Sequence, residues 1–204
     1  MYIPSSFAMG TTAQMVQFVR NNSFGILFSY IGQPMATHLP FIIEESPGRL
    51  PILRGHFAKA NPHWRRLWET EVLVVFSGPH SYISPTWYQR APAVPTWNYA
   101  TVHIRGRCTM LTDTSELHIL LTQMMHFYEP DAAVDDFPDS GFYAKMAQAA
   151  VGFNIEITQM DGALKMSQNR SAEDVQGVMQ QLRRSPRQVD HEVAELMDRE
   201  LHHR

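Results

Sequence analysis

The sequence has little of what several common protein classes require. Cys108 is the only cysteine among 204 residues, which excludes an intrachain disulfide and a multi-cysteine metal site and suits a reducing compartment. No apolar run reaches the length of a membrane-spanning helix, and residues 1–10 lack the basic start and apolar core of a secretory signal. We therefore expect a soluble, cytoplasmic protein with no membrane association.

Excess charge and the common catalytic motifs are also missing. The formal net charge is -3, so the chain has no general attraction for a polyanion, and Arg183, Arg184 and Arg187 form only a small basic group. The ten histidines include no His-x-His or His-Glu-x-x-His spacing, and no Gly-x-Ser-x-Gly elbow is present. We expect no metal site and identify no catalytic residue.

Apolar residues make up 44% of the chain, which is typical of a folded globular protein. The predicted strands are rich in β-branched and aromatic residues or alternate between apolar and polar positions. Gly78-Pro79 is expected to end one strand, and Asp161-Gly162 is expected to form a hairpin turn. The predicted strands span 24–31, 36–43, 50–57, 71–76, 97–110 and 151–158, with a short seventh at 164–166.

Helical spacing and capping residues predict the helices. They span 12–20, 62–69, 114–127, 140–149, 172–182 and 188–201. Because the first strands follow one another directly, the pattern favours an antiparallel barrel over a doubly wound α/β sheet. We expect a mainly β protein with flanking helices (α+β), with one domain over residues 1–182 and a charged C-terminal helix or arm over 183–204.

The strand-rich stretch 55–106 is expected to form much of a ligand site. At its start, His56, Lys59 and Asn61 bring donors and a positive charge to the beginning of a short helix, an arrangement suited to a phosphate. An equally plain interpretation is that His56 is buried and hydrogen-bonded while Lys59 is solvated.

Aromatic and hydroxyl side chains alternate further along this stretch, in 76–88 and 94–99. Flat heteroaromatic ligands such as flavin, haem or a nucleobase favour this mixture of stacking walls and polar donors. The alternative is that the aromatic residues belong to the core or to a subunit interface. The candidate residues are Tyr82, Ser84, Trp97 and Asn98.

A third candidate segment, 162–170, is an apolar strand that ends in donor-rich residues. Lys165, Gln168 and Arg170 have side chains able to contact a phosphate or a ribityl chain. The alternative is an exposed loop in which Asn169 or Ser171 caps the next helix.

Several blocks of sequence occur together in the order typical of one family. They are Met1-Tyr2-Ile3-Pro4, Gly55-His56 through Pro62-His63-Trp64, residues 78–85, residues 94–99, and Lys165-Met166-Ser167-Gln168-Asn169-Arg170. Together they resemble the PaiB family, whose members are described as FMN-binding negative transcriptional regulators. The resemblance extends from Met1 to about Leu182.

The resemblance implies a split β-barrel like that of pyridoxamine-phosphate-oxidase-like flavoproteins, and a homodimer with FMN at the subunit interface. It places Thr37, His38 and Leu39 against the isoalloxazine ring. His56, Lys59 and Asn61 lie toward the phosphate, Tyr82, Ser84, Trp97 and Asn98 line the ring or the dimer contact, and Lys165, Gln168 and Arg170 close the site. Lys59 stands where the family pattern has arginine, so the charge is kept without the bidentate fork.

Three functions remain open from the sequence. The family implies a repressor of transcription, although the charge balance does not support direct DNA binding. A flavin-dependent oxidoreductase acting on a small molecule is the alternative, because a fold does not decide a function. Haem binding through His38 or His56 is a third hypothesis.

Overall fold

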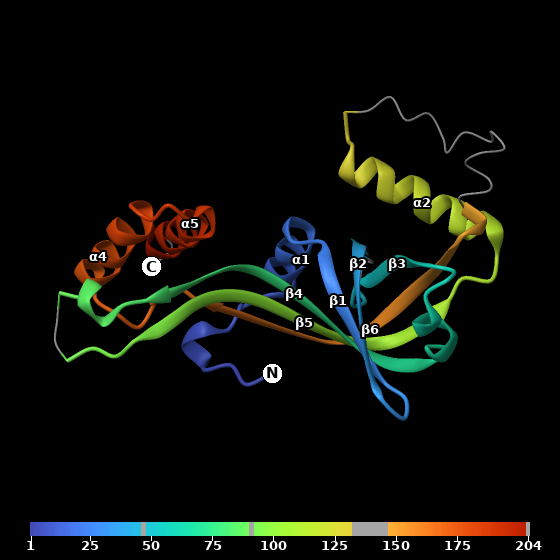
Figure 1. Ribbon diagram of the computed structural model, residues 1–204, viewed down its shortest axis with the longest axis horizontal. Helices are drawn as coiled ribbons and strands as arrows, with labels where there is room; N and C mark the ends of the chain where they lie inside the picture. Colours follow the sequence, from blue (N-terminus) through green and yellow to red (C-terminus); the bar gives the residue numbers. More distant parts are fainter. Residues whose placement is uncertain (46–47, 90–91, 132–146, 203–204) are drawn as a thin grey trace. The chain divides into compact units, whose positions relative to one another are not determined.

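The structure is a computed structural model and describes residues 1–45, 48–89, 92–131 and 147–202. In this part of the chain six antiparallel strands form a closed barrel in the order β1-β2-β3-β6-β5-β4 (Figure 1). This confirms the split β-barrel with flanking helices. The strands are β1 (Phe24–Tyr30), β2 (Pro34–Glu44), β3 (Ile52–Ala58), β4 (Thr70–Ile83), β5 (Thr96–Met110) and β6 (Ala150–Lys165).

The helices begin where side chains cap them. The Asp113 carboxylate accepts from the Ser115 N–H at 2.8 Å, and the Ser171 hydroxyl accepts from the Asp174 N–H at 3.2 Å. The helices are α1 (Thr12–Asn21), α2 (Thr114–Tyr128), α4 (Ala172–Arg183) and α5 (Gln188–His202), with short 3-10 helices η1 (Ser5–Phe7), η2 (Pro62–Arg66) and η3 (Pro85–Trp87). Most of the predicted helix 140–149 lies outside the described residues, which include 147–149 of it. None of the described helices is both long and apolar enough to cross a membrane.

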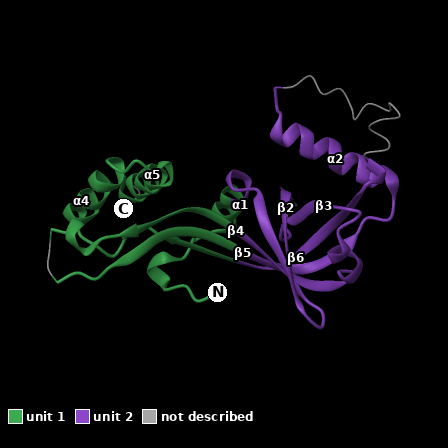
Figure 2. Ribbon diagram, viewed as in Figure 1, with its two compact units in different colours: residues 1–18, 77–102, 161–204 green, residues 19–76, 103–160 purple. Residues whose placement is uncertain are grey.

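The chain divides into two compact units, each described by itself (Figure 2). Unit 1 comprises residues 1–18, 77–102 and 161–204, and unit 2 comprises 19–76 and 103–160. Each of β4, β5 and β6 contributes residues to both units.

Unit 2 is built around phenylalanine rings. Phe41 contacts Phe76 and Phe153 with ring centroids 5.4 and 5.9 Å apart, and Phe57 lies 5.0 Å from Phe153. Glycine at position 55 makes room for this core, because a Cβ atom there would lie 2.8 Å from the Phe153 ring. These rings hold together β2, β3, β4 and β6, and the candidate residues of this unit extend from β2, from β3 and from the turn that follows β3.

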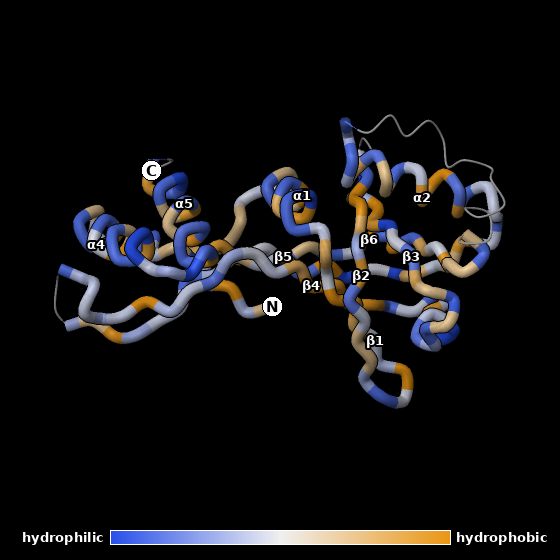
Figure 3. Tube along the Cα trace, turned by 45° about the horizontal axis from the view of Figure 1, so that its top comes forward, coloured by the Kyte–Doolittle hydropathy of each residue, from blue (hydrophilic) through white to orange (hydrophobic). Residues whose placement is uncertain are grey.

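Unit 1 has a separate core between its helices and strands. Val175 and Leu182 of α4 are buried with Val193 and Met197 of α5, and Ile83 of β4 packs in the same cluster. Hydrophilic residues predominate along α4 and α5 and are interrupted by these apolar ones (Figure 3). The α5 helix is thus packed against α4, while the predicted domain boundary at 182/183 stays a prediction.

The predicted end of a strand at Gly78-Pro79 is wrong, because β4 continues to Ile83. The pairing of β1 with β4 covers Leu73–Val75, so Pro79 lies beyond the described paired part of β4. Proline, which lacks an N–H group, is tolerated at such an open side of a strand. Gly78 serves close packing, since a Cβ atom there would lie 2.8 Å from the Phe18 ring.

The predicted hairpin turn at Asp161-Gly162 is also wrong, and β6 runs without interruption from Ala150 to Lys165. The short seventh strand predicted at 164–166 is therefore not separate, because residues 164 and 165 form the end of β6. Gly162 is needed for a close approach, since a Cβ atom there would lie 2.7 Å from the Met9 Sδ. In the same stretch, Ala163 forms an isolated antiparallel β-bridge with Ala8 from the N-terminal part of the chain.

Candidate functional site

The imidazole of His63 in unit 2 is fully buried and bonded through both ring nitrogens. Its Nε2 lies 2.8 Å from the Ser29 hydroxyl of β1, and its Nδ1 lies 2.8 Å from the Thr37 hydroxyl of β2. Asn61 joins the cluster twice, because its Oδ1 accepts from the His63 N–H at 3.0 Å and its Nδ2 donates to the Thr37 hydroxyl at 3.4 Å. Two strands and the start of η2 therefore meet at one side chain.

Local sequence explains how His63 comes to this place. Asn61 caps η2 and Pro62 occupies its first position, which fixes the backbone that carries the imidazole. The edge of the His63 ring packs on Phe57, with centroids 5.7 Å apart. Burial lowers the pKa of His63 below its ordinary value because the charged form loses its hydration.

The three consecutive residues predicted to face the ring do not share one orientation. Thr37 is turned to His63 and Leu39 is buried, while His38 between them is exposed. This follows from the alternation of side chains along a strand. The His38 ring stacks on the exposed Phe24 of β1, with centroids 6.2 Å apart and planes at 28°. Only His38 of the three presents its side chain on this outer surface.

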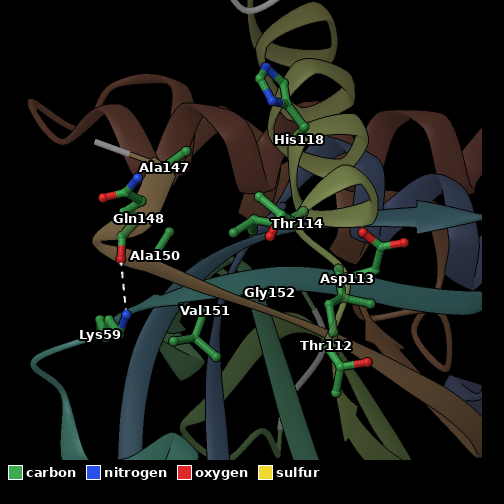
Figure 4. A pocket seen from close by; sticks show the side chains of 12 residues that line it. Lys59, Thr112, Asp113, Thr114, His118, Ala147, Gln148, Ala150, Val151 and Gly152 are labelled. Carbon is green, nitrogen blue, oxygen red and sulfur yellow. Dashed lines mark hydrogen bonds between the residues drawn. The ribbon is translucent and has the colours of Figure 1, made fainter. Parts of the chain in front are cut away.

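Lys59 lies at a pocket of about 420 Å³ that is lined by residues from the β3 end, the start of α2 and the start of β6 (Figure 4). Its Nζ donates to the carbonyl of Gln148 at 3.4 Å. Hydroxyls of Thr112 and Thr114 and the carboxylate of Asp113 also belong to this pocket. The pocket thus offers a cation and hydroxyl donors beside apolar walls, with one carboxylate that already caps α2.

His56 is half-buried beside α2. Its Nδ1 lies 3.4 Å from the Sδ of Met124 in α2, and burial lowers its pKa. The described contacts of His56 do not include Lys59 or Asn61, which extend from the turn that follows β3. Thr37 and Asn61 are brought together, whereas His56 contacts α2 instead.

In unit 1, exposed aromatic side chains gather on β4 and β5. Trp97 is 49% exposed and lies 6.1 Å from Tyr82, which is 42% exposed, and 6.3 Å from His80. Large aromatic rings left accessible to this degree on neighbouring strands suit stacking with a ring or a partner.

Three predicted residues of unit 1 are engaged in local structure. Ser84 caps η3 by accepting from the Thr86 N–H at 3.3 Å. Asn98 is fully buried and donates to the Ser167 hydroxyl at 3.0 Å, which pins a residue held at a positive φ of 62°. Gln168 accepts from the Met166 N–H at 2.6 Å and donates to the Leu164 carbonyl. These bonds shape the turn after β6.

Lys165 and Arg170 supply positive charge near this turn. Lys165 donates to the Thr96 hydroxyl and lies 5.8 Å from the Phe7 ring, and Arg170 lies 4.7 Å over the Tyr88 ring. Burial, followed by the charge of Arg170, lowers the pKa of Lys165. The predicted residues therefore fall into two sets, one in each unit, and their assignment to a ligand stays a prediction.

Sequence reasoning missed the central role of His63 and the participation of Ser29. His63 belonged to a recognised block, but its partners lie 26 and 34 residues away and only the hairpin register brings them to it. A signal was available in the Asn61-Pro62 start of η2, which fixes the residue that follows. Cys108 of β5, by contrast, is buried away from these sites, and burial raises the pKa of its thiol to about 12.

Comparison with known proteins identifies the family. The family described as "Putative FMN-binding domain" matches residues 1–159. The chain is 38% identical over 206 residues to the protease synthase and sporulation protein PAI 2 of Bacillus subtilis (strain 168), with 98% of each chain covered. The chain belongs to the PaiB family. This membership confirms the resemblance and assigns FMN as the cofactor.

Other similarities of this PaiB-family chain agree in sequence and fold. The uncharacterized protein AN0679 of Emericella nidulans is 32% identical over 225 residues, with 88% of this chain and 89% of that one covered. The flavocytochrome Anf3 of Azotobacter vinelandii is 14% identical with a TM-score of 0.62, covering 78% of this chain and 69% of that one. The latter similarity concerns the fold alone.

The donor chemistry of unit 2 fits FMN. A phosphate favours a cation with hydroxyl donors, which Lys59, Thr112 and Thr114 supply at one pocket. A flat isoalloxazine ring favours an accessible aromatic surface with a polar donor, which Phe24 and His38 supply. No residue of either set is committed to an ion pair in the described part of the chain.

Acid should destabilise the fold through its buried neutral histidines. The pKa values of His56 and His63 are lowered in the folded state, so their contribution is complete above pH 6.5 and is lost as the pH falls below that value. We expect the free energy of unfolding to fall from pH 6.5 to 5.5 with a slope of up to about 1.4 kcal/mol per pH unit for each histidine. Urea unfolding at several pH values measures this slope.

The combined variant His56→Gln and His63→Gln should flatten that dependence, while His80→Gln, at an exposed position, should leave it unchanged. A slope that is equal in all three proteins would contradict the buried neutral state of these histidines.

Proposed function

We propose that this PaiB-family protein is a homodimer that binds FMN and acts as a negative regulator of transcription. The observation that carries the regulatory part is the match over 98% of both chains to a protein named for protease synthase and sporulation. The similarity to this relative covers both units of the chain. It therefore supports a role that requires the whole chain, such as regulation, better than a role that requires only the barrel.

Our assignment of the FMN contacts begins with Lys59. Its ammonium group would hold the phosphate with the hydroxyls of Thr112 and Thr114, and His38 on Phe24 would face the ring. Thr37 and Asn61 act behind these residues through their bonds to His63. When bound, FMN supplies a ring that accepts and releases electrons. The remaining predicted contacts are Leu39, His56, Tyr82, Ser84, Trp97, Asn98, Lys165, Gln168 and Arg170.

The proposed dimer uses the outer surface of the β1–β2 hairpin. Phe24, Phe28 and Tyr30 of β1 are 64%, 36% and 74% exposed and alternate along one side of the strand. The residues paired with this side of β1 on β2 are Pro40, His38, Ala36 and Pro34. A row of exposed aromatic residues beside small and apolar ones is typical of a surface that a second chain covers.

The proposed regulation does not rely on α4 and α5 as DNA-binding helices. Residues 172–202 contain seven carboxylates and four arginines, an unfavourable balance for a phosphate backbone. Arg183 pairs with Asp198 at 3.2 Å and Arg187 lies 3.8 Å from Asp190. Any contact with DNA would be made by a surface outside α4 and α5 or through a partner protein that binds DNA.

Lys59→Ala should weaken FMN binding, because it removes the cation that we assign to the phosphate. We expect the Kd for FMN to rise about tenfold or more, whereas riboflavin, which lacks the phosphate, should bind the two proteins equally. Flavin fluorescence titration measures both ligands. Arg49→Ala, which removes an exposed cation elsewhere in unit 2, is the control, and equal FMN affinity in all proteins would refute this phosphate contact.

Phe28→Asp should convert the dimer to a monomer, because a carboxylate on the outer surface of β1 would be buried without a partner. Sedimentation velocity measures the change, and circular dichroism checks that the fold persists. Ile119→Asp, which places the same charge at a 55% exposed position of α2, should leave the dimer intact. A wild-type protein that sediments as a monomer would refute the proposed dimer.

Loss of the gene should raise the transcript levels of a defined set of genes in the organism that encodes it. Transcript sequencing measures this, and re-expression of the wild-type protein should restore repression. A gel shift at increasing salt then separates direct from indirect action on DNA. Unchanged transcripts together with anaerobic FMN reduction by a nicotinamide donor would instead support the oxidoreductase.

A further inference from the structure

A single buried side chain connects the two segments to which we assign the FMN ring and phosphate. The His63 imidazole bonds to Thr37, the residue before His38, and its backbone N–H bonds to Asn61, two residues after Lys59. Because Asn61 also donates to the Thr37 hydroxyl, the segments are joined directly as well as through the ring.

The protonation state of this ring decides the directions of these bonds and whether the cluster carries a charge. A neutral imidazole has one donor nitrogen and one acceptor nitrogen, so one of the two hydroxyls at 2.8 Å accepts a hydrogen bond from the ring and the other donates one to it. An imidazolium has two N–H donors, and both hydroxyls could accept from them, but its positive charge would then be buried beside uncharged groups. The neutral ring makes the same two bonds without placing a charge inside the protein, so burial favours it.

The surroundings of His63 favour the neutral ring. Its described contacts come from β1, β2, β3 and its own turn, and they are Ser29, Thr37, Phe57 and Asn61, all uncharged. The charged groups nearest in sequence are Lys59, Arg65 and Arg66, which are cationic and oppose a further positive charge. No carboxylate contacts the ring in the part of the chain that the structure describes.

We propose that His63 is a positioning residue of the FMN site: its neutral imidazole fixes β2 at Thr37 and the β3–η2 turn at Asn61, so that His38 and Lys59 are held for the ring and the phosphate. The inference rests on the proposed FMN contacts. Protonation places an unpaired charge in this buried cluster, and loss of the imidazole removes its bonds, so either change weakens the link between the two segments and FMN is bound more weakly in mild acid.

Two substitutions at position 63 separate positioning from packing. Glutamine has one amide oxygen and one amide nitrogen, so His63→Gln can bond to both hydroxyls without titrating, whereas His63→Leu fills the space without bonding. At pH 7.5 we expect the Kd for FMN to rise about tenfold in His63→Leu and to stay within about twofold in His63→Gln. Thermal unfolding by circular dichroism verifies that each variant is folded.

Thr37→Val tests the same link from the other strand, and it conserves the volume of the side chain. It should weaken FMN binding to a similar extent as His63→Leu. The matched control is Thr158→Val, which removes a hydroxyl bonded to the Arg105 carbonyl and should leave the affinity unchanged. FMN affinity in both His63→Leu and Thr37→Val equal to that of the wild type would overturn the proposal.

The pH profile gives a readout that packing alone would not change. The FMN phosphate loses charge near pH 6 in every variant, so the decisive quantity is the difference between wild type and His63→Gln. We expect the wild-type Kd to rise more steeply than that of His63→Gln between pH 7.5 and 5.5. Parallel profiles would overturn the positioning role of the neutral ring.

A measurement without flavin distinguishes failure of this inference from failure of the proposed function. In the flavin-free protein, NMR titration of the histidine ring carbons should show His63 remaining neutral below pH 6.5, the ordinary pKa of a histidine. A wild-type protein that does not bind FMN would refute the proposed function and, with it, this role. A wild-type protein that binds FMN but has His63 charged at pH 6 would refute this role alone.

Discussion

The candidate site in unit 2 depends on the pairing of β1 with both β2 and β4, which closes the sheet into a barrel. β1 has only seven residues, and its register places Ser29 beside the buried imidazole while Phe24, Phe28 and Tyr30 stay on the outer surface. A slip of one residue would exchange these two sets, putting aromatic rings inside and hydroxyls outside. The polar cluster and the aromatic surface are therefore two consequences of one register.

Much of this architecture follows from local patterns in the sequence, because the determinants are local. The consecutive strands β1 and β2, the long β5 and the helix α2 were all predicted from residue type and spacing. The errors arose at Gly78-Pro79 and Asp161-Gly162, where turn-forming residues occur inside strands. At both sites the glycine is required by a neighbour distant in sequence, Phe18 in one case and Met9 in the other, and such a contact leaves no local signature.

The candidate site was predictable as a region and less so as a set of contacts. Asn98 and Gln168 carry amides that suit a ligand as well as they suit the backbone, and the structure shows them bonded within the protein. His63 shows the opposite case, in which the sequence did not indicate a role. A histidine close to an N-cap does not predict that the hydroxyl of Ser29, 34 residues earlier, bonds to its ring. Residue type identifies what a side chain can bond, but the tertiary fold decides which partner it meets.

The proposed contacts also imply that flavin binding and dimer formation are coupled. Lys59 is a single exposed cation, and a point charge in water contributes far less to phosphate affinity than a buried, bidentate group. Most of the affinity for FMN must then come from burying its ring, yet His38 and Phe24 lie on an open surface. In the proposed dimer a second chain covers that surface and so buries the bound ring. FMN binding would then favour dimer formation, and dimer formation would raise the affinity for FMN by the same factor, because thermodynamic linkage is reciprocal.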